Sequence, residues 1–214
     1  MFLILHDGTA VSRPTFFGCL KYKSNCLTFR FRSDLQRLLN KMITVICGTH
    51  RPKNITRKIV DKYCQMLRAA GQEINLFELE ELPRDFVFGD SFGNRSPVTE
   101  EIINTKIIPA DKLVIISPEY NGSYPGVLKA FMDGMDPRLW KGKKVALVGV
   151  ASGRAGNIRG MDHLTHVLHY LRMEVFSNKV PISKVNGLLN DQGELEDEET
   201  LRVLQRQVDE FLEY

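Results

Sequence analysis

The sequence contains few cysteines, and none of them has the spacing in which cysteines usually act together. Its four cysteines, Cys19, Cys26, Cys47 and Cys64, form no CxxC pair and no short cluster with histidine. This count is low for a disulfide scaffold, so a reducing compartment, and therefore a cytoplasmic protein, is expected. With 214 residues, 43% of them hydrophobic, the chain can bury a core of ordinary size without such cross-links.

Long apolar runs are also missing. The longest have the length of β-strands, so no membrane-spanning segment is predicted. The patterns GxxxxGK[ST] and GxGxxG do not occur, which argues against a P-loop nucleotide hydrolase and against a separate dinucleotide fingerprint. No internal repeat or low-complexity tract is visible.

A basic surface on the main part of the chain is a third missing feature. The net charge is +3, but residues 1–41 hold seven basic side chains and only two acidic ones. Residues 42–214 therefore carry a net charge of −2. This balance does not support nucleic acid as a partner.

Residues 1–41 show the period of neither a strand nor a helix. Three interpretations compete: a basic transit peptide, a short apolar signal, or an extension upstream of a true start at Met42. The apolar stretch Phe2–Leu5 is too short for the core of a signal. We favour the last interpretation and expect a poorly structured leader without a catalytic role. A short helix at 29–39 is the one element predicted within it.

From Met42 onward, short apolar runs alternate with amphipathic stretches. Five runs are typical of buried parallel strands: 43–47, 73–78, 112–117, 144–150 and 174–180. Helices are predicted at 54–70, from Thr99 onward, at 125–135, 157–171 and 197–214, with a loop at 81–97. This alternation predicts an α/β fold, a doubly wound five-stranded parallel sheet in the order 2-1-3-4-5 with helices on both faces.

In that strand order, ligands bind where strands one and three end. The first strand is followed by Gly48, which allows a tight exit, and then by hydroxyl or amide groups on Thr49, Asn54 and Thr56. Arg51 adds a planar permanent charge suited to phosphate, and the N–H groups that open the next helix point to the same place. The segment therefore predicts a phosphate site. In the alternative interpretation, Thr49 and Asn54 only cap the helix and Arg51 is a solvated charge.

The third strand is followed by a loop with two prolines, two glycines and two tyrosines between Ser117 and Gly126. Pro118 fixes the exit, while Asn121 and Gly122 can present backbone N–H groups to a ring carbonyl or nitrogen. Tyr120 or Tyr124 can pack against an aromatic ligand. We interpret this loop as a platform for a flat ring, the alternative being a proline-rich connection that only starts a helix.

Two motifs carry a family resemblance. Gly48-Thr49-x-Arg51, and the longer and more specific segment Ser117-Pro118-Glu119-Tyr120-Asn121-Gly122-Ser123-Tyr124-Pro125-Gly126-Val127-Leu128-Lys129-Ala130-Phe131-Met132-Asp133, resemble the NADPH-dependent FMN reductase family. The resemblance covers residues 42 to about 211 and implies a flavodoxin-like FMN-binding domain at 42–214. It also implies that the first loop binds the FMN phosphate and that the Pro-Glu-Tyr-Asn loop lines the isoalloxazine. The chain departs from the family at Asn54, usually serine, and at Ile55, where a polar or aromatic residue is common.

The same resemblance implies a role for the segment after the fourth strand. In the family this segment is rich in serine and glycine and closes over the flavin edge. Ser152, Gly153 and Arg154 occupy those positions here. The cofactor contacts implied in total are Thr49, Arg51, Asn54, Ile55, Thr56, Pro118, Glu119, Tyr120, Asn121, Gly122, Ser152, Gly153 and Arg154.

The activity implied is hydride transfer from NADPH or NADH through FMN to a small acceptor, which in the family is a flavin, a quinone, an azo compound or a metal oxyanion. No catalytic acid or base is strictly required, no metal is implied, and a homodimer or homotetramer is expected. Two alternatives stay open. A flavodoxin-type electron carrier is disfavoured by the weak charge of residues 42–214, and a relative that has lost FMN binding is kept open by the departures at Asn54 and Ile55.

The remaining conspicuous residues have simpler interpretations. His163, His166 and His169 recur every three residues, but no cysteine or carboxylate set completes a metal site, so structural or interface roles are favoured. Cys47 ends a buried strand and is predicted to be an inert core thiol. Trp140 is assigned to packing or to an interface.

Overall fold

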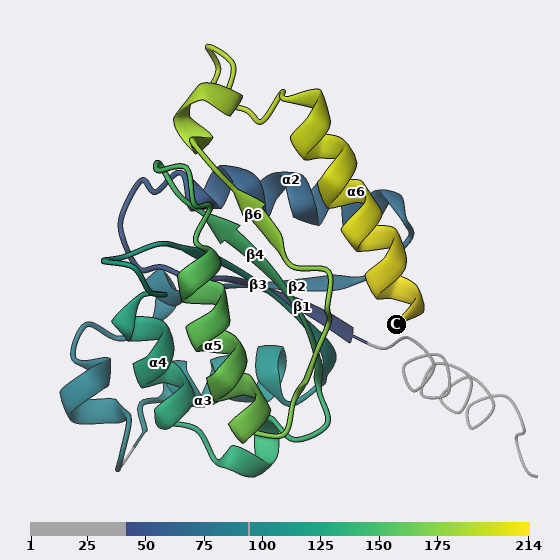
Figure 1. Cartoon of the computed structure of the whole chain (residues 1–214). Helices are drawn as coiled ribbons and strands as arrows, with labels where there is room; N and C mark the ends of the chain where they lie inside the picture. Colours follow the sequence, from purple (N-terminus) through teal and green to yellow (C-terminus); the bar gives the residue numbers. More distant parts are fainter. Residues whose placement is uncertain (1–41, 94) are drawn as a thin grey trace, which may run out of the picture. The chain divides into compact units, whose positions relative to one another are not determined.

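The computed structural model describes residues 42–93 and 95–214 (Figure 1). The predicted leader at 1–41, with its short helix at 29–39, lies outside the described residues.

A parallel sheet forms the centre of this part of the chain. Its strands are β1 (Met42–Cys47), β2 (Ile74–Glu78), β3 (Ala110–Pro118), β4 (Lys144–Val150), β5 (Glu174–Val175) and β6 (Val180–Ile182). They are arranged in the order β2-β1-β3-β4-β5, and β6 also pairs with β4. The predicted order 2-1-3-4-5 is confirmed, and the central strands are buried on both faces, which explains their continuous valine and isoleucine runs.

The prediction of a single fifth strand at 174–180 is wrong. Two short strands replace it, with Glu174 opposite Lys144 and Val180 opposite Val148 on the same neighbouring strand. The Phe176 N–H still donates to the Val145 carbonyl at 2.9 Å, and the chain leaves the sheet after this residue. The Phe176 ring packs against Phe211 with ring centroids 5.7 Å apart. An edge position tolerates this interruption because only one side of the strand is paired.

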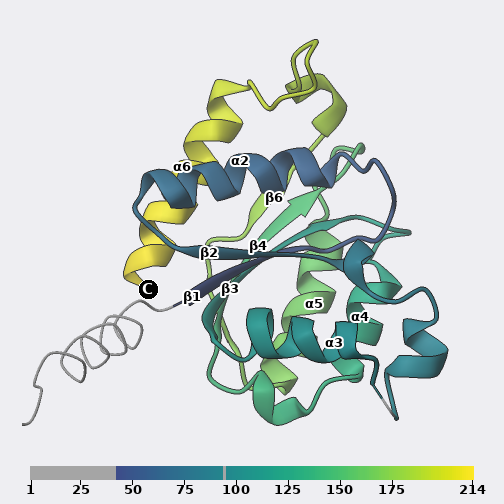
Figure 2. The ribbon, with the colours of Figure 1, turned by 180° about the vertical axis from the view of Figure 1, so that it is seen from behind.

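Helices cover both faces of the sheet (Figures 1 and 2). One face carries α2 (Thr56–Ala69) and α6 (Glu198–Glu213), and the other carries α3 (Pro97–Ile102), α4 (Gly126–Asp133) and α5 (Ile158–Tyr170). Each face has its own buried hydrophobic cluster. None of the helices at 42–93 and 95–214 combines the length and the apolar character that crossing a bilayer needs.

Aromatic packing centres on Phe131 of α4. Its ring lies 4.9 Å from that of Phe77 and meets Trp140 edge-on at 6.0 Å. All three side chains are fully buried, which confirms the packing role predicted for Trp140. On the opposite face, the Tyr63 hydroxyl donates to Gln207 Oε1 at 3.0 Å and joins α2 to α6.

The segment predicted as a loop at 81–97 contains helical structure. A 3₁₀ turn spans Leu79–Glu81, a π-helical turn spans Phe86–Asp90, and α3 begins at Pro97 rather than at Thr99. Ser96 caps α3 by accepting a hydrogen bond from the Thr99 N–H, and proline is well suited to the first helical position. The prediction treated this proline as a loop residue, so it placed the start of the helix too late. The other helices begin one or two residues later than predicted.

Candidate functional site

Three loops emerge side by side at the carboxyl ends of β1, β3 and β4, because these strands are neighbours and parallel (Figure 1). We call residues 48–55 the phosphate loop, 119–125 the platform loop and 151–157 the third loop. Backbone hydrogen bonds continue past the strands: Gly48 N–H donates to the Ile116 carbonyl at 2.8 Å, and Glu119 N–H donates to the Val150 carbonyl at 2.9 Å. The loops therefore start at fixed positions relative to one another.

In the phosphate loop, Thr49 and Asn54 are bonded to the chain itself. The Thr49 side chain is only 1% exposed, and its hydroxyl oxygen accepts a hydrogen bond from the Arg51 N–H at 3.1 Å. The Asn54 amide donates to the Arg51 carbonyl, and its oxygen accepts from the Arg57 N–H, both at 2.8 Å. Asn54 thus closes the loop and caps the start of α2, as in the alternative interpretation of the sequence.

Arg51 is the predicted phosphate-loop group that faces solvent. Its guanidinium makes no hydrogen bond or ion pair to any residue of the described part of the chain, whereas Arg57 is paired with both Asp61 and Glu78. The first turn of α2 contains no acidic residue. An unneutralised guanidinium beside a positive helix end is suited to binding an anion.

Ile55 and Thr56 lie at the boundary between the phosphate loop and α2. Ile55 occupies the position before the first helical residue and is 37% exposed, while Thr56 is buried. Neither side chain forms a polar contact with another described residue. Their backbone N–H groups belong to the open end of the helix and can donate to a ligand.

The platform loop contains a tight two-residue turn. Tyr120 and Ser123 exchange backbone hydrogen bonds of 2.8 and 3.1 Å, and the residues between them, Asn121 and Gly122, have φ angles of 51° and 79°. Two successive positive φ values define a type I′ turn, for which Asn-Gly is the preferred sequence. The N–H groups of Asn121 and Gly122 take no part in the turn's own hydrogen bonds, so they remain as donors for a ligand.

A hydroxyl pair joins the phosphate loop to the platform loop. Thr49 Oγ1 and the Tyr120 hydroxyl lie 2.7 Å apart, and either can donate. Tyr120 is thereby held over the end of β1 at partial exposure. Tyr124 packs instead against the hydrophobic cluster beneath α4, and this burial raises the pKa of its phenol. Tyr120 is therefore the better placed of the two tyrosines to contact a ligand.

The other predicted site residues, which follow β3 and β4, are half-buried or exposed. Pro118 and Glu119 are half-buried where β3 ends, and Ser152, Gly153 and Arg154 are exposed in the third loop. The third loop is anchored through its carbonyls: Lys184 N–H donates to Gly153 at 2.9 Å, and the Ser183 hydroxyl donates to Arg154 at 2.7 Å. The side chains are left exposed on a fixed backbone.

Two residues that sequence reasoning did not assign to the site also contact the platform loop. His163 Nδ1 of α5 lies 3.0 Å from Ser123 Oγ. The amide nitrogen of the buried Asn157 donates to the Ser117 carbonyl at 2.9 Å. The sequence analysis placed Asn157 at the start of a predicted helix, whereas it has a left-handed φ of 64° and α5 begins at Ile158. His166 and His169 are exposed, and the residues described contain no cluster of three side chains able to hold a metal ion.

Cys47 lies directly beneath the phosphate loop at the end of β1. It is fully buried, and this burial raises the pKa of its thiol to about 12. Its thiol donates to Asn54 Oδ1 at 3.8 Å. The burial confirms the predicted core position, and a thiol that stays protonated at neutral pH is expected to be a poor nucleophile.

Known proteins share sequence and fold with this chain. The chain is 25% identical over 174 residues to a 2-hydroxy-1,4-benzoquinone reductase of Burkholderia sp, covering 79% of this chain and 93% of that protein. It is 31% identical over 156 residues to an NADPH azoreductase of Bacillus sp. (strain OY1-2), covering 72% and 81%. The solved structure of FerB, a flavoenzyme NAD(P)H:(acceptor) oxidoreductase from Paracoccus denitrificans, matches the fold with a TM-score of 0.65 at 24% identity, covering 81% of this chain and 96% of that one.

The family profile described as NADPH-dependent FMN reductase matches residues 42–187, a range that contains β1, β3, β4 and all three loops. The loops whose joined geometry is described above are thus part of the shared region. The chain belongs to the NADPH-dependent FMN reductase family.

Proposed function

We propose that this chain holds FMN across its phosphate and platform loops and passes hydride from NAD(P)H to a small acceptor of the quinone or azo type. As a member of its family, the chain is an FMN-dependent NAD(P)H oxidoreductase. The observation that carries the assignment to these residues is the 2.7 Å hydroxyl pair between Thr49 and Tyr120. This pair fixes an anion-binding loop and a ring-binding loop side by side.

The phosphate loop provides the charge for this binding. Arg51 is exposed and has no protein partner among the described residues, so its planar guanidinium is available to phosphate oxygens. The N–H groups at the start of α2 add donors and a positive dipole end. Thr49 and Asn54 contribute by shaping the loop. The departure from the family at Asn54 is thus compatible with phosphate binding, because Asn54 caps α2.

The platform loop provides a place for the ring. FMN, when bound, accepts hydride from a nicotinamide and donates it to an acceptor, so the protein needs to supply orientation and electrostatics only. The free N–H groups of Asn121 and Gly122 can stabilise negative charge on the reduced ring. A Cβ added to Gly122 or Gly153 would have no neighbour within 4 Å, so both loops border open space where ligands can approach.

We propose that the acceptor is a small molecule. The supporting relatives include a benzoquinone reductase and an azoreductase, both of which act on flat conjugated compounds by name. Such acceptors can stack on the same open face as the nicotinamide, so that the two bind in turn. Ping-pong kinetics are the expected consequence.

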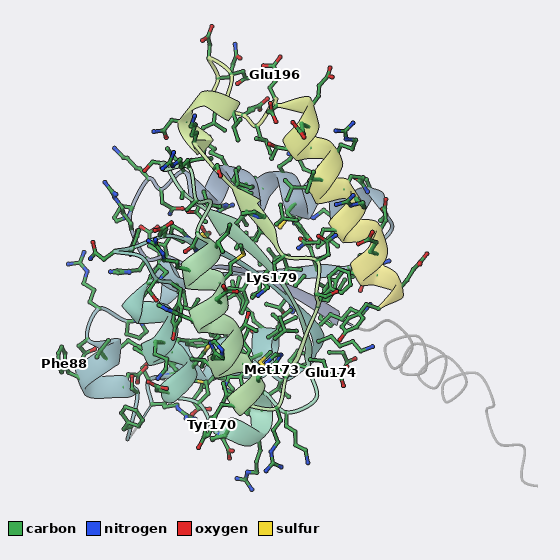
Figure 3. The ribbon with its side chains drawn as sticks, in the orientation of Figure 1. Phe88, Tyr170, Met173, Glu174, Lys179 and Glu196 are labelled. Atoms are coloured by element: carbon green, nitrogen blue, oxygen red, sulfur yellow. The ribbon has the colours of Figure 1, made fainter. Side chains whose placement is uncertain are left out.

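We also propose a cytoplasmic homo-oligomer. Phe88 is 97% exposed and Phe92 80% exposed on the segment before α3, and Figure 3 shows Phe88 projecting away from the ribbon. The base of that segment is held firmly, because the buried Asp90 carboxylate accepts hydrogen bonds from Ser96 and Thr99. Large aromatic side chains on a fixed exposed segment support contact with a second subunit.

The first experiment measures FMN and riboflavin binding by fluorescence quenching. Because riboflavin lacks the phosphate, Arg51→Gln should weaken FMN binding by about 10- to 100-fold, the value of a hydrogen bond to a charged group, and leave riboflavin binding unchanged. Lys53→Gln, which removes an exposed cation from the same loop, is the matched control and should have a much smaller effect. Equal losses for both flavins would contradict the role of Arg51.

A second experiment separates the enzyme from an electron carrier. Anaerobic NADPH should bleach the bound flavin band, and a benzoquinone should restore it and sustain steady-state NADPH oxidation without a protein partner. Bleaching that requires a separate reductase would favour a flavodoxin-type carrier, and purified protein that binds no FMN would favour a relative without the cofactor.

A further inference from the structure

Asn157, at the end of the third loop, has three uncommon features together. It is fully buried, its φ angle is 64°, and its side-chain oxygen Oδ1 has no hydrogen-bond partner among the described residues. A left-handed residue other than glycine and an unpaired buried oxygen both disfavour the folded state locally. Their combination beside a ligand site suggests a functional reason.

The amide of Asn157 reaches from the loop after β4 across to β3. Its nitrogen donates to the Ser117 carbonyl at 2.9 Å. The orientation of the amide follows from this contact, since a flipped side chain would place one oxygen against another. Ser117 and Pro118 are the last two residues of β3, so the bond fixes the strand end that leads into the platform loop.

Two glycines leave the space that this side chain occupies. A Cβ on Gly149 of β4 would lie 3.0 Å from the Asn157 Cβ. A Cβ on Gly160 of α5 would lie only 2.0 Å from Asn157 Oδ1 and 2.8 Å from the carbonyl carbon of Ser123, where the type I′ turn ends. Asn157 therefore contacts the end of β3 just before the platform loop, and Gly160 lies against Ser123 within that loop.

We infer that Asn157 is a positioning residue that sets the platform loop relative to the third loop and so determines the geometry of the ring end of the flavin site. This inference rests on the proposed function. Asn157 acts through the Ser117 carbonyl and the turn, because its buried side chain contacts the chain itself.

Asn157→Gly is the direct test. Glycine accepts the same backbone conformation, and the variant removes the unpaired oxygen together with the hydrogen bond, so these two effects on stability oppose each other. The melting temperature should therefore change by only a few degrees. The dissociation constant for FMN should rise about tenfold or more, and the visible absorption band of bound FMN should shift because the ring end of the site is altered.

Arg172→Gly is the matched control. Arg172 is exposed at the end of α5 and also has a left-handed φ, of 61°. Its replacement reproduces the change in backbone freedom away from the site, so the melting temperature can shift but FMN affinity and the flavin spectrum should not. An Asn157→Gly protein that binds FMN with wild-type affinity and spectrum would overturn the inference.

Asn157→Asp provides a readout that does not depend on the glycine variant folding. A protonated aspartic acid can donate to the Ser117 carbonyl, an ionised one cannot, and burial raises the pKa of such a carboxyl. FMN affinity relative to the wild type should therefore recover as the pH is lowered from about 8 to about 5.5. The other titratable groups on the elements packed here are common to both proteins and cancel in that ratio; they are Glu119 and, on α5, Asp162, His163, His166 and His169.

A ratio that stays constant over this pH range would overturn the inference. A wild-type protein that binds no FMN would instead overturn the proposed function and this inference with it. Wild-type binding together with unaffected variants would overturn this inference alone, so the two failures are distinguishable.

Discussion

The hydroxyl pair between Thr49 and Tyr120 can be tested by a double-mutant cycle. Tyr120→Phe removes one hydrogen bond and leaves the Thr49 hydroxyl paired with the Arg51 N–H. One neutral hydrogen bond contributes about 0.5–1.5 kcal/mol, so the free energy of unfolding should fall by about 1 kcal/mol. For a chain of this size that corresponds to a loss of about 2–4 °C in melting temperature.

Thr49→Val keeps the volume of the buried side chain but removes its hydroxyl. The Tyr120 hydroxyl and the Arg51 N–H both lose a partner, yet both belong to partly exposed residues and can turn to water. The expected loss is about 1–2 kcal/mol. Both single variants break the same bond, so the double variant should be less destabilised than the sum of the two by about 0.5–1.5 kcal/mol.

The assay is urea unfolding of the four proteins without FMN, followed by circular dichroism. Thr105→Val is the matched control, since its hydroxyl bonds only to the Glu101 carbonyl on the surface and should combine additively with Tyr120→Phe. If the Thr49 and Tyr120 variants are also additive within about 0.3 kcal/mol, the bridge does not form in solution and the argument for joined loops fails.

Three further predictions concern other parts of the described structure. Burial raises the thiol pKa of Cys47 to about 12 and of Cys64 to about 11, so iodoacetamide at neutral pH should leave both unmodified in the native protein, as mass spectrometry can show. The same shifts mean that the unfolded state loses its thiol protons first, and the free energy of unfolding should therefore fall as the pH rises above about 9. Phe131→Ala should cost about 3–5 kcal/mol in urea unfolding, because the ring is fully buried between Phe77 and Trp140. Replacing Phe88 and Phe92 by serine should lower the mass measured by light scattering if they lie at a subunit contact, while the melting temperature of the isolated subunit stays unchanged.

Sequence periodicity predicted the central fold well because burial on both faces leaves a strong local signal. The runs at 43–47, 112–117 and 144–150 coincide with β1, β3 and β4, and the strand order followed from the alternation of strands and helices. The fifth strand could not be predicted in the same way. Next to its interruption, Phe176 packs against Phe211, and this contact joins residues far apart in the sequence.

The candidate site also combines features that the local sequence predicts with features that depend on contacts between distant residues. The loops that contain it were predicted from the ends of the strands, and Arg51 is exposed as a ligand for phosphate should be. The roles of Thr49 and Asn54 within the chain depend on partners that only the fold brings near, above all Tyr120, which lies 71 residues from Thr49. Asn157 escaped prediction for the same reason, since its partner Ser117 is 40 residues away.

Stability and ligand geometry are separable in this fold. The two hydrophobic clusters lie on opposite faces of the sheet and are built from strands and helices, whereas the three loops are joined by single hydrogen bonds at one edge. A core truncation such as Phe131→Ala removes several times more free energy than the loss of one such bond. Loop variants should therefore change flavin affinity while the protein stays folded, and core variants should unfold the protein before they change the site. A loop substitution such as Thr49→Val that destabilised the protein as much as Phe131→Ala would show that the loops are part of the cooperative core.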